Sequence, residues 1–528
     1  MKEKIKKLIK EGLKSLNLKA GDFIIEHPTD LRMGDYSTNV AIKYGHKEEI
    51  REYLDKNKPK EVEKIELAGT GFINFYLSKE FFKNSIGEII KKEKNFGKNK
   101  NLKGEKVIVE HTDPNPFKEF HIGHLMPNVI GSSIARIFEW NGAEVRQANY
   151  QGDIGLHVAK AVWAMLRGNH IGESYVVGNK AYDEDPEAKK EIEEINRKIY
   201  DKSDGEINKV YGEGRKESLE YFENIYKKLD SKFDYYFFES ETSEVGKKIV
   251  LKNIGKVFEE GDNRAIVFKG EKVDPSLHTR VFINSQGIPT YEAKDLGNAK
   301  NKYDKYHYDF SVIVTGNEIK DYFRVVLEAM KQVLPDLAKK TKHLPHGMLR
   351  LTTGKMSSRT GDVITAEELI EDVKKKVKGD EQVAVGAIKY MILRQAIGND
   401  IIFDIEKSVS TEGDSGVYLQ YAYARTNSLL EKATGKIDAN APRENIHEIE
   451  KLLYRFPEVV ERAGHEYAPH HITTYLTQLA GSFNNFYAHE QVIGDSPESS
   501  YRLAIVKAFN IVMKNGLDIL GIPTPERL

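Results

Sequence analysis

The spacing of hydrophobic residues changes twice along the chain, and these changes divide it into three predicted domains. Up to about residue 100, an amphipathic helical pattern is followed by shorter helical and alternating segments, which is typical of an α+β domain. From Val107 onward, short runs rich in β-branched residues are each followed by a helical pattern, which favours a parallel, doubly wound sheet with ligands at the carboxyl ends of its strands. After residue 372 the apolar residues recur about every 3.6 positions, which predicts an α-helical bundle. We therefore expect domains at 1–100, 101–372 and 373–528.

The first domain contains one predicted strand and ends in a predicted linker. Residues 65–78 alternate between apolar and polar positions like a strand, and Gly69-Thr70-Gly71 within them favours a plain turn. The Lys-rich run 91–106 breaks the apolar pattern, so we expect a solvated connector there.

A charged and Tyr-rich stretch interrupts the second domain at about 167–258. Its helical patterns are polar on two sides, so we expect this insertion to pack outside the sheet. Two later segments, RAIVFKG and RVFIN, are predicted to resume the strands of the α/β pattern.

Composition excludes several classes of protein. The chain has 80 basic and 81 acidic residues, so any nucleic-acid surface must be a local patch. Because cysteine is absent, disulfides, Cys-based zinc sites and thiol nucleophiles are excluded. The N-terminus lacks an apolar signal region, and no run of about 18 apolar residues could cross a bilayer. We therefore expect a cytoplasmic protein with no membrane contact.

The stretch from Lys106 to Gly131 carries the strongest chemical signal. A β-branched run, a loop with two prolines and a long apolar-periodic segment predict a strand, a loop and a helix. His121 and His124 lie at the start of that helix, where free backbone N–H groups and the helix dipole favour phosphate. Gly123 between them removes a side chain that would keep a flat base or sugar from the backbone. The stretch therefore predicts a nucleotide site.

Other catalytic motifs are absent from the sequence. There is no G-x-x-x-x-G-K-[ST], no G-x-S-x-G, and His465-Glu466 lacks the second histidine of a zinc protease motif. A nucleotide site without an evident protein nucleophile suits attack by a substrate on a phosphate, where positioning and charge neutralisation supply most of the catalysis.

Two motifs together carry a family resemblance. HIGH at 121–124 and GKMSSR at 354–359 resemble the paired signature of class I aminoacyl-tRNA synthetases. The segments EHTDPNPFKEFHIGHL, YEAKDL, YLQYAYAR and GDYSTNVA resemble the arginyl-tRNA synthetase family, in that family's order. The resemblance implies a Rossmann-type catalytic domain, formation of arginyl-adenylate from arginine and ATP, and transfer of the arginyl group to tRNA(Arg).

The resemblance assigns an ATP site, with ATP entering as its Mg²⁺ complex and without protein-bound zinc. The implied ATP-binding residues are His121, Gly123, His124, Met348, Lys355, Met356 and Ser357. The sequence departs from the family's KMSKS pattern, because Ser358 replaces the second lysine. Lys118 and Arg359 are the two candidates for the missing positive charge.

An arginine pocket is predicted from helix spacing and from the resemblance. Tyr291 and Asp295 lie four residues apart on a predicted helix, so they share one face, and a carboxylate there can bind a guanidinium bidentately. The resemblance adds Glu239 as a second carboxylate that binds the guanidinium. It assigns Glu110 and Asn115 to the end of the substrate arginine that carries the α-amino and carboxylate groups. Ile319 stands where the family often has Gln.

The predicted bundle is the expected tRNA surface. Aromatic residues cluster there with Arg425, and unstacked loop bases are read by stacking on aromatic rings. Most of these rings are expected to be core: Tyr418, Tyr423, Tyr475, Phe483 and Phe486. By resemblance, the tRNA-binding candidates are Tyr421, Arg425, Tyr487 and Leu528. The resemblance also implies that the N-terminal domain touches the tRNA body and that adenylate formation needs bound tRNA.

Two alternatives stay open at the level of sequence. One is a synthetase for another amino acid, such as lysine or glutamate, and the other is a catalytically silent RNA-binding paralogue. The insertion is short for an editing domain and has no evident barrel pattern, which is consistent with a charged substrate that needs no editing. We expect the protein to be a monomer.

Overall fold

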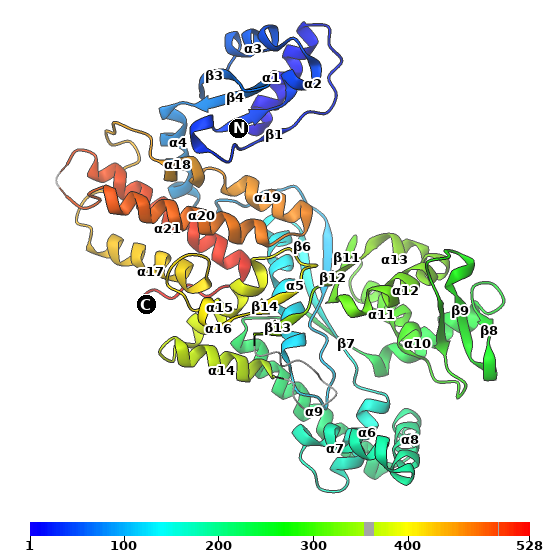
Figure 1. Cartoon of the computed structure of the whole chain (residues 1–528). Helices are drawn as coiled ribbons and strands as arrows, with labels where there is room; N and C mark the ends of the chain where they lie inside the picture. The colour runs from blue at the N-terminus through cyan, green and yellow to red at the C-terminus, as the bar shows by residue number, and fades with distance from the viewer. Residues whose placement is uncertain (353–363, 495) are drawn as a thin grey trace.

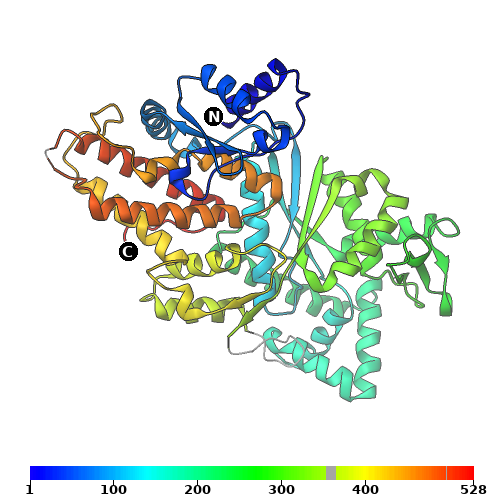
Figure 2. The same ribbon diagram turned by 45° about the horizontal axis from the view of Figure 1, so that its top comes forward.

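A computed structural model describes residues 1–352, 364–494 and 496–528. Helix α5 (Ile122–Trp140) and a central sheet occupy the middle of the molecule (Figure 1). The N-terminal domain lies over one end of the helical bundle, and the elements at about 259–340 lie on the far side of the sheet from that bundle (Figures 1 and 2).

The central sheet is parallel and has five strands in the order β12-β11-β5-β6-β7. Its strands are β5 (Lys106–Glu110), β6 (Glu144–Gln151), β7 (Tyr235–Phe238), β11 (Phe310–Gly316) and β12 (Thr341–His346). Alternate side chains face opposite layers: Val107 and Val109 pack in the core that contains α5, whereas Ile108 packs with Tyr306 and Tyr308. The strand order reverses between β5 and β11, so their carboxyl ends open a crevice suited to a ligand. The predicted doubly wound sheet is confirmed.

The expectation that residues 167–258 pack wholly outside the sheet is wrong. Strand β7 pairs in parallel with β6 and forms the edge of the central sheet. The last turns of α9 bury Phe222, Ile225 and Tyr226 in the main core. The helices α7 (Ile171–Glu184) and α8 (Pro186–Asp201) and the first part of α9 (Gly205–Lys228) form a separate lobe with α6 (Leu156–Met165), which precedes the stretch. Helix α10 (Glu239–Lys252) follows β7. The short aromatic run YYFF forms a strand because its neighbours bury it, a tertiary effect that the charged surroundings hide.

The strands between residues 259 and 283 also differ from the prediction. RAIVFKG and RVFIN do not join the central sheet but form a separate antiparallel sheet in the order β10-β9-β8. This sheet and the helices around it share their own hydrophobic core. The elements are β8 (Glu259–Glu260), β9 (Ile266–Lys269), β10 (Thr279–Ile283), α11 (Tyr291–Lys305), α12 (Lys320–Val333) and α13 (Pro335–Lys340).

The N-terminal domain is an antiparallel sheet covered by helices. Its elements are α1 (Lys2–Ser15), β1 (Ile25–Glu26), β2 (Tyr36–Thr38), α2 (Val40–Tyr44), α3 (Lys47–Lys56), β3 (Val62–Ala68), β4 (Phe72–Leu77) and α4 (Lys79–Lys92). The predicted turn at Gly69–Gly71 is confirmed, and it divides the predicted strand into the hairpin β3–β4. His27 and Tyr36 both bind the Glu458 carboxylate of the helical bundle, so this domain is held to the bundle by buried polar contacts.

The predicted connector at 91–106 is only partly solvated. Lys91 and Lys92 belong to α4, and Lys106 begins β5. Phe96 is buried, and Asn515 donates to the carbonyls of Glu93 and Phe96 at 3.0 Å each. The segment therefore packs against the bundle, which the run of lysines around it conceals.

The predicted helical bundle is confirmed. Its helices are α14 (Ala366–Lys376), α15 (Glu381–Leu393), α16 (Ile405–Ser408), α17 (Gly416–Lys432), α18 (Glu448–Leu453), α19 (Phe456–Glu466), α20 (His470–His489) and α21 (Ser499–Leu520). A small parallel pair, β13 (Leu349–Leu351) and β14 (Ile401–Phe403), lies beside them. One hydrophobic core joins α5 to α15, α17, α20 and α21, so the bundle and the central sheet are packed together rather than linked loosely. Within the described ranges, no helix is long and apolar enough to span a membrane.

Candidate active site

The N-terminus of α5 presents two histidines, as the sequence predicts. His121 is the N-cap, and its Nδ1 accepts a hydrogen bond from the Gly123 backbone N–H at 3.0 Å. His124 Nδ1 accepts from the His121 backbone N–H at 3.3 Å, which completes a capping box. The two rings stack with centroids 3.8 Å apart. Two imidazoles therefore replace the usual Ser or Thr and Glu at the start of this helix.

Both histidines are neutral near pH 7. Burial, with the nearby Lys118 ammonium, lowers the pKa of His121 to about 4. Burial and His121 hold the pKa of His124 well below its ordinary value. Because each Nδ1 accepts a backbone hydrogen bond, each Nε2 carries the proton. Each ring can therefore donate one Nε2–H to an anion without first gaining a proton.

A glycine is needed at position 123 for a structural reason in addition to the predicted access of the nucleotide to the backbone. A Cβ at this position would lie 2.7 Å from His121 Cε1, closer than packing allows. The glycine therefore lets the His121 ring fold over the helix start and cap it.

The loop before α5 holds unusual backbone conformations. Thr112, Asp113 and Phe117 have φ values of 82°, 46° and 66°, which are costly for residues with a Cβ, most of all for β-branched Thr112. Such strain is found where surrounding structure fixes a functional loop.

Lys118 lies in this loop with its ammonium 4.3 Å from the centroid of the Tyr175 ring. Burial, followed by the neighbouring Lys160, lowers the pKa of Lys118 to about 8. Its charge therefore lies close to the histidines whose pKa values it lowers, on the side of the predicted phosphate site.

A cavity of about 530 Å³ opens at the carboxyl ends of β5 and β11. It brings together His121, Gly123 and His124 with Met348, so four of the predicted ATP-binding residues line one space. Ile319, at the end of the short 3-10 turn Asn317–Ile319, lines it as well. The size and the mixture of apolar wall and polar groups suit a nucleotide. The predicted residues Lys355, Met356, Ser357 and Arg359 lie outside the described residues.

Tyr291 and Asp295 lie in the first turns of α11, as the spacing predicts. The Tyr322 hydroxyl donates to Asp295 Oδ2 at 2.6 Å. Burial is the main cause that raises the pKa of Asp295, to about 8, and the Glu110 and Glu239 carboxylates raise it further against the Tyr322 hydrogen bond. Tyr291 is 54% exposed, and the centroid of its ring lies 5.2 Å from Lys294 Nζ. Asp295 is thus a carboxyl group that is costly to ionise until a cation arrives.

The other two predicted carboxylates already have cationic partners. Glu239 Oε2 lies 2.6 Å from Lys294 Nζ, and Glu110 Oε2 lies 2.7 Å from Lys302 Nζ. Asn298 Nδ2 also donates to Glu110 Oε2 at 2.9 Å. Lys294, Asn298 and Lys302 are not among the residues predicted from the sequence, although they recur every four positions on α11. That spacing is a signal of one shared helical face.

Asn115 lies beside Glu239. A Cβ at Gly152 would lie 2.3 Å from Asn115 Oδ1 and 3.0 Å from Glu239 Oε1, so both side chains approach the same glycine at the end of β6. The structure therefore brings Asn115 together with Glu239.

Asp113 is a further carboxyl group that the sequence analysis did not identify. It lines the cavity and accepts a hydrogen bond from the Tyr150 backbone N–H at 2.7 Å. Burial and the Glu110 carboxylate hold its pKa well above the ordinary value. Its place in the sequence, three residues after Glu110 and two before Asn115, is the only local signal for it.

The pocket holds more carboxyl groups than bonded cations. Its four coupled carboxyl groups are Glu110, Asp113, Glu239 and Asp295. Lys302 and Lys294 pair with the first and third of these. In the part of the chain that the structure describes, Asp113 and Asp295 form no ion pair. Asp113 and Asp295 are therefore two buried carboxyl groups without a bonded cation, and burial raises the pKa of each.

The predicted tRNA-binding residues lie on the surface of the bundle. Tyr421 and Leu528 are 45% and 48% exposed, and the Arg425 guanidinium lies 4.3 Å from the centroid of the Tyr487 ring. The expected core role is confirmed for Tyr423, Tyr475, Phe483 and Phe486, which are buried. Tyr418 is partly buried and accepts a hydrogen bond from Asn484.

Three family models match consecutive parts of the chain. The model for the arginyl tRNA synthetase N terminal domain matches residues 3–77. The model for tRNA synthetases class I (R), catalytic domain, matches residues 85–405, and the model for the DALR anticodon binding domain matches residues 419–528.

Curated relatives give the same picture over most of the chain. An arginine–tRNA ligase of Treponema denticola is 31% identical over 505 residues, which cover 86% of this chain and 85% of the relative. The corresponding ligase of Borreliella burgdorferi is 31% identical over 507 residues, covering 87% of this chain and 86% of the relative.

Two solved structures share the fold over the whole length. The arginyl-tRNA synthetase of Thermus thermophilus superposes with a TM-score of 0.80 at 22% identity and covers 100% of both chains. The arginyl-tRNA synthetase of Plasmodium falciparum superposes with a TM-score of 0.82 at 21% identity, covering 100% of this chain and 99% of the other.

Proposed function

The chain belongs to the arginyl-tRNA synthetase family, and from this membership we propose how its residues divide the ligation of arginine to tRNA. It is a class I arginine–tRNA ligase. In the proposed first step, a carboxylate oxygen of arginine attacks the α-phosphorus of ATP, and the bond to pyrophosphate breaks. In the second step, a hydroxyl of the 3′-terminal ribose of tRNA(Arg) attacks the activated carbonyl, and AMP leaves.

ATP is proposed to bind, as its Mg²⁺ complex, in the cavity at the start of α5. The Nε2–H groups of His121 and His124 donate to phosphate oxygens, with the helix dipole behind them. These donors stabilise the extra charge that develops on the phosphates during attack. Gly123 and Met348 line the nucleotide, and Lys118 supplies positive charge from the preceding loop. From sequence alone, Lys355, Met356, Ser357 and Arg359 are proposed to close on the triphosphate.

The proposed arginine site rests on one observation, the two buried carboxyl groups, Asp113 and Asp295, that have no bonded cation among the described residues. Arginine carries two cationic groups, a guanidinium and an α-ammonium. Asp295, with Glu239 and Tyr291, binds the guanidinium. Asp113 joins Glu110 and Asn115 at the α-ammonium end, beside the cavity where the α-phosphate lies. A ligand with a single cationic group could ionise only one of these two carboxyl groups, whereas the two cationic groups of arginine can pair with both.

Pyrophosphate exchange tests the assignment of the substrate. In the presence of tRNA(Arg), the enzyme is expected to exchange pyrophosphate into ATP with arginine and not with lysine or glutamate. Exchange with lysine alone would overturn the arginine assignment, and no exchange with any amino acid would favour a silent RNA-binding paralogue.

A matched pair of variants tests the pocket. Asp295→Asn is expected to raise the KM for arginine at least about 30-fold, because removing one partner of a buried charge pair costs about 2 kcal/mol or more. The KM for ATP should change little. Asp304→Asn, on the same helix and exposed beside Lys300, should behave like the wild type. An equal loss of arginine and ATP binding in Asp295→Asn would mean that Asp295 is structural.

The tRNA is proposed to lie along the bundle, with Tyr421, Arg425, Tyr487 and Leu528 near the anticodon loop and the N-terminal domain against the tRNA body. We propose the domain limits 1–100, 101–372 and 373–528. Size-exclusion chromatography with light scattering tests the predicted monomer, and the cytoplasmic location stays a prediction.

A further inference from the structure

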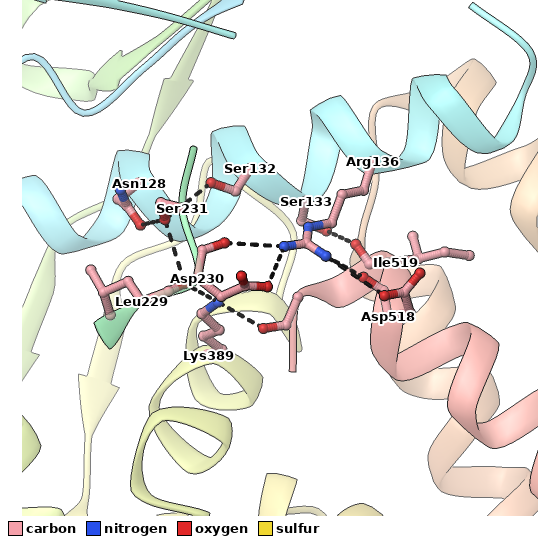
Figure 3. Close-up of polar contacts among 11 residues, drawn as sticks. Asn128, Ser132, Ser133, Arg136, Leu229, Asp230, Ser231, Lys389, Asp518 and Ile519 are labelled. Atoms are coloured by element: carbon pink, nitrogen blue, oxygen red, sulfur yellow. Dashed lines mark hydrogen bonds and ion pairs between the residues drawn. The ribbon is translucent and has the colours of Figure 1, made fainter. Parts of the chain in front are cut away.

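Three side chains from the catalytic half and from α15 bind the carboxyl end of α21. Arg136 Nη1 donates to the Asp518 carbonyl at 3.2 Å, and Ser133 Oγ donates to the Ile519 carbonyl at 3.4 Å. Lys389 Nζ donates to the carbonyl of Gly521, the C-cap of the helix, at 2.7 Å. The last carbonyls of a helix lack partners within the helix and favour a cation (Figure 3). The end of the longest bundle helix is therefore held by residues outside it.

The same two cations also hold the turn that follows α9. Lys389 Nζ donates to the Leu229 carbonyl at 2.6 Å. Arg136 Nη2 donates to the Asp230 carbonyl at 3.1 Å and to its Oδ2 at 2.8 Å. Figure 3 shows both side chains between the two chain segments. The end of α21 and the turn at 229–231 are thus fixed to one another through Arg136 and Lys389.

From this turn, polar contacts run to the nucleotide cavity. Ser231 Oγ donates to Asn128 Oδ1 at 2.7 Å, and Asn128 Nδ2 donates to Thr112 Oγ1 at 3.1 Å. Thr112 lines the cavity. The turn also leads into β7, which ends at Phe238, and the next residue is Glu239 of the arginine pocket.

From the other side, the end of α21 leads to the proposed tRNA surface. After Gly521 the chain runs to Leu528 along α17, where Gln420 Nε2 donates to the Pro523 carbonyl at 2.8 Å and Asn427 Nδ2 to the Glu526 carbonyl at 3.4 Å. Tyr421 and Arg425 lie on this same helix. A displacement of the tail against α17 therefore acts on the end of α21.

Lys389 is unusual as a packing residue. Its side chain is only 2% exposed, and within the described ranges it bonds to two carbonyls and forms no ion pair. Burial, followed by the Arg136 charge, lowers the pKa of Lys389 to about 7. A buried ammonium costs more than an apolar side chain of the same length, and such groups are kept where they fix one arrangement of elements. Lys389 holds the carboxyl ends of α9 and α21 together at one point, which is such an arrangement.

We propose that Lys389 and Arg136 are positioning residues that couple the seating of tRNA on the C-terminal tail to the catalytic pocket. They do so by fixing the end of α21 to the turn at 229–231. The proposal rests on the proposed contact of the tail and α17 with tRNA. Neither residue is among those that line the nucleotide cavity.

The test compares Lys389→Met with a matched variant, Lys451→Met. Lys451 Nζ also donates to a carbonyl, that of Leu31 at 3.0 Å, but at the junction of the bundle and the N-terminal domain. Lys389→Met is expected to lower kcat for aminoacylation about tenfold, within the usual range of coupling between sites, while the Kd for tRNA and the KM for ATP change less than about twofold. Lys451→Met should keep the wild-type kcat.

A double-mutant cycle separates coupling from simple loss of stability. In the wild-type background, Tyr487→Ala is expected to weaken tRNA binding and, through the coupling, to lower kcat as well. In the Lys389→Met background, Tyr487→Ala should still weaken tRNA binding but should no longer lower kcat. Independent, multiplicative effects on kcat would overturn the proposal, as would a wild-type kcat in Lys389→Met. If Lys389→Met fails to fold, Arg136→Lys takes its place in the same cycle, because it keeps the charge and loses the fork that reaches both segments. Failure of the wild type to use arginine would instead overturn the proposed function.

Discussion

Lys294 Nζ lies 2.6 Å from Glu239 Oε2, in a pocket where the two side chains are only 5% and 7% exposed. The lysine therefore occupies, before any substrate arrives, a place beside the carboxylate that is predicted to bind the guanidinium. Burial lowers the pKa of Lys294, but the Glu239 carboxylate outweighs this and leaves it above the ordinary value, so the lysine is an ammonium. Burial raises the pKa of Glu239, and the Lys294 ammonium opposes that shift. The free enzyme thus neutralises Glu239 with its own cation and leaves Asp295 for the substrate.

Lys294→Met should make the enzyme depend on arginine for stability. Removing one partner of a buried pair costs about 3–5 kcal/mol, because Glu239 is left buried without a cation. Arginine would then supply the missing cation, so it should raise the Tm of Lys294→Met more than the Tm of the wild type. Thermal unfolding with and without arginine measures both shifts. Lys294→Arg keeps the pair and serves as the control; an equal or smaller shift in Lys294→Met would contradict a shared site at Glu239.

Arginine binding should release protons and strengthen as the pH rises towards 8. The pKa of Asp295 is about 8 in the free enzyme, so below pH 8 the group is mostly protonated. A guanidinium needs the carboxylate, so each pH unit below 8 should weaken binding up to about tenfold, or 1.36 kcal/mol. Calorimetry at pH 7 in two buffers of different ionisation enthalpy counts the protons released. Arginine binding to Asp295→Asn should release fewer protons than binding to the wild type, although Asp113 still contributes. Equal proton release from the wild type and Asp295→Asn would rule out Asp295 as the source.

The sequence predicted the parts of the site that depend on local spacing. His121 and His124 are three residues apart at a helix start, and Tyr291 and Asp295 are four apart on one helix, so the chain itself places each pair. The partners of the carboxylates were missed because they come from distant segments: Glu239 and Lys294 are 55 positions apart, and Glu110 and Asn298 are 188 apart. Strand β7 was missed for a similar reason, since only pairing with β6 makes YYFF a strand. Burial and charge coupling, which set the pKa of Asp295, exist only after these segments meet.

The two histidines should act on the transition state as neutral donors. His124→Ala is expected to lower the rate of adenylate formation about 10²- to 10³-fold, as loss of one oxyanion donor does, with little change in the KM for ATP. Because the pKa values of both histidines lie far below 6.5, these groups should impose no loss of rate between pH 6 and 8. Single-turnover formation of the adenylate measures both effects. His121→Asn keeps a side-chain acceptor that can cap the helix, so it tests whether damage to the fold alone explains a loss of rate. A rate that falls as the pH rises through 6.5 would indicate an imidazolium instead.

Tyr487 should contribute to tRNA affinity through its ring and not through its hydroxyl. The Arg425 guanidinium lies 4.3 Å from the ring centroid, which places a cation and a flat aromatic surface together on the exposed side of the bundle. An unstacked base can bind such a platform, and one base–aromatic stack is worth about 1–3 kcal/mol. Tyr487→Ala should therefore weaken tRNA binding roughly 5- to 150-fold by that energy, while the KM values for arginine and ATP stay near those of the wild type. Tyr487→Phe should bind tRNA normally, because it keeps the ring. The ring centroid of the buried Phe483 lies 6.2 Å from that of Tyr487, so Tyr487→Ala also loses some packing, and thermal unfolding of both variants measures that loss of stability. A folded Tyr487→Ala protein with wild-type tRNA affinity would move the anticodon contact to another part of the bundle surface.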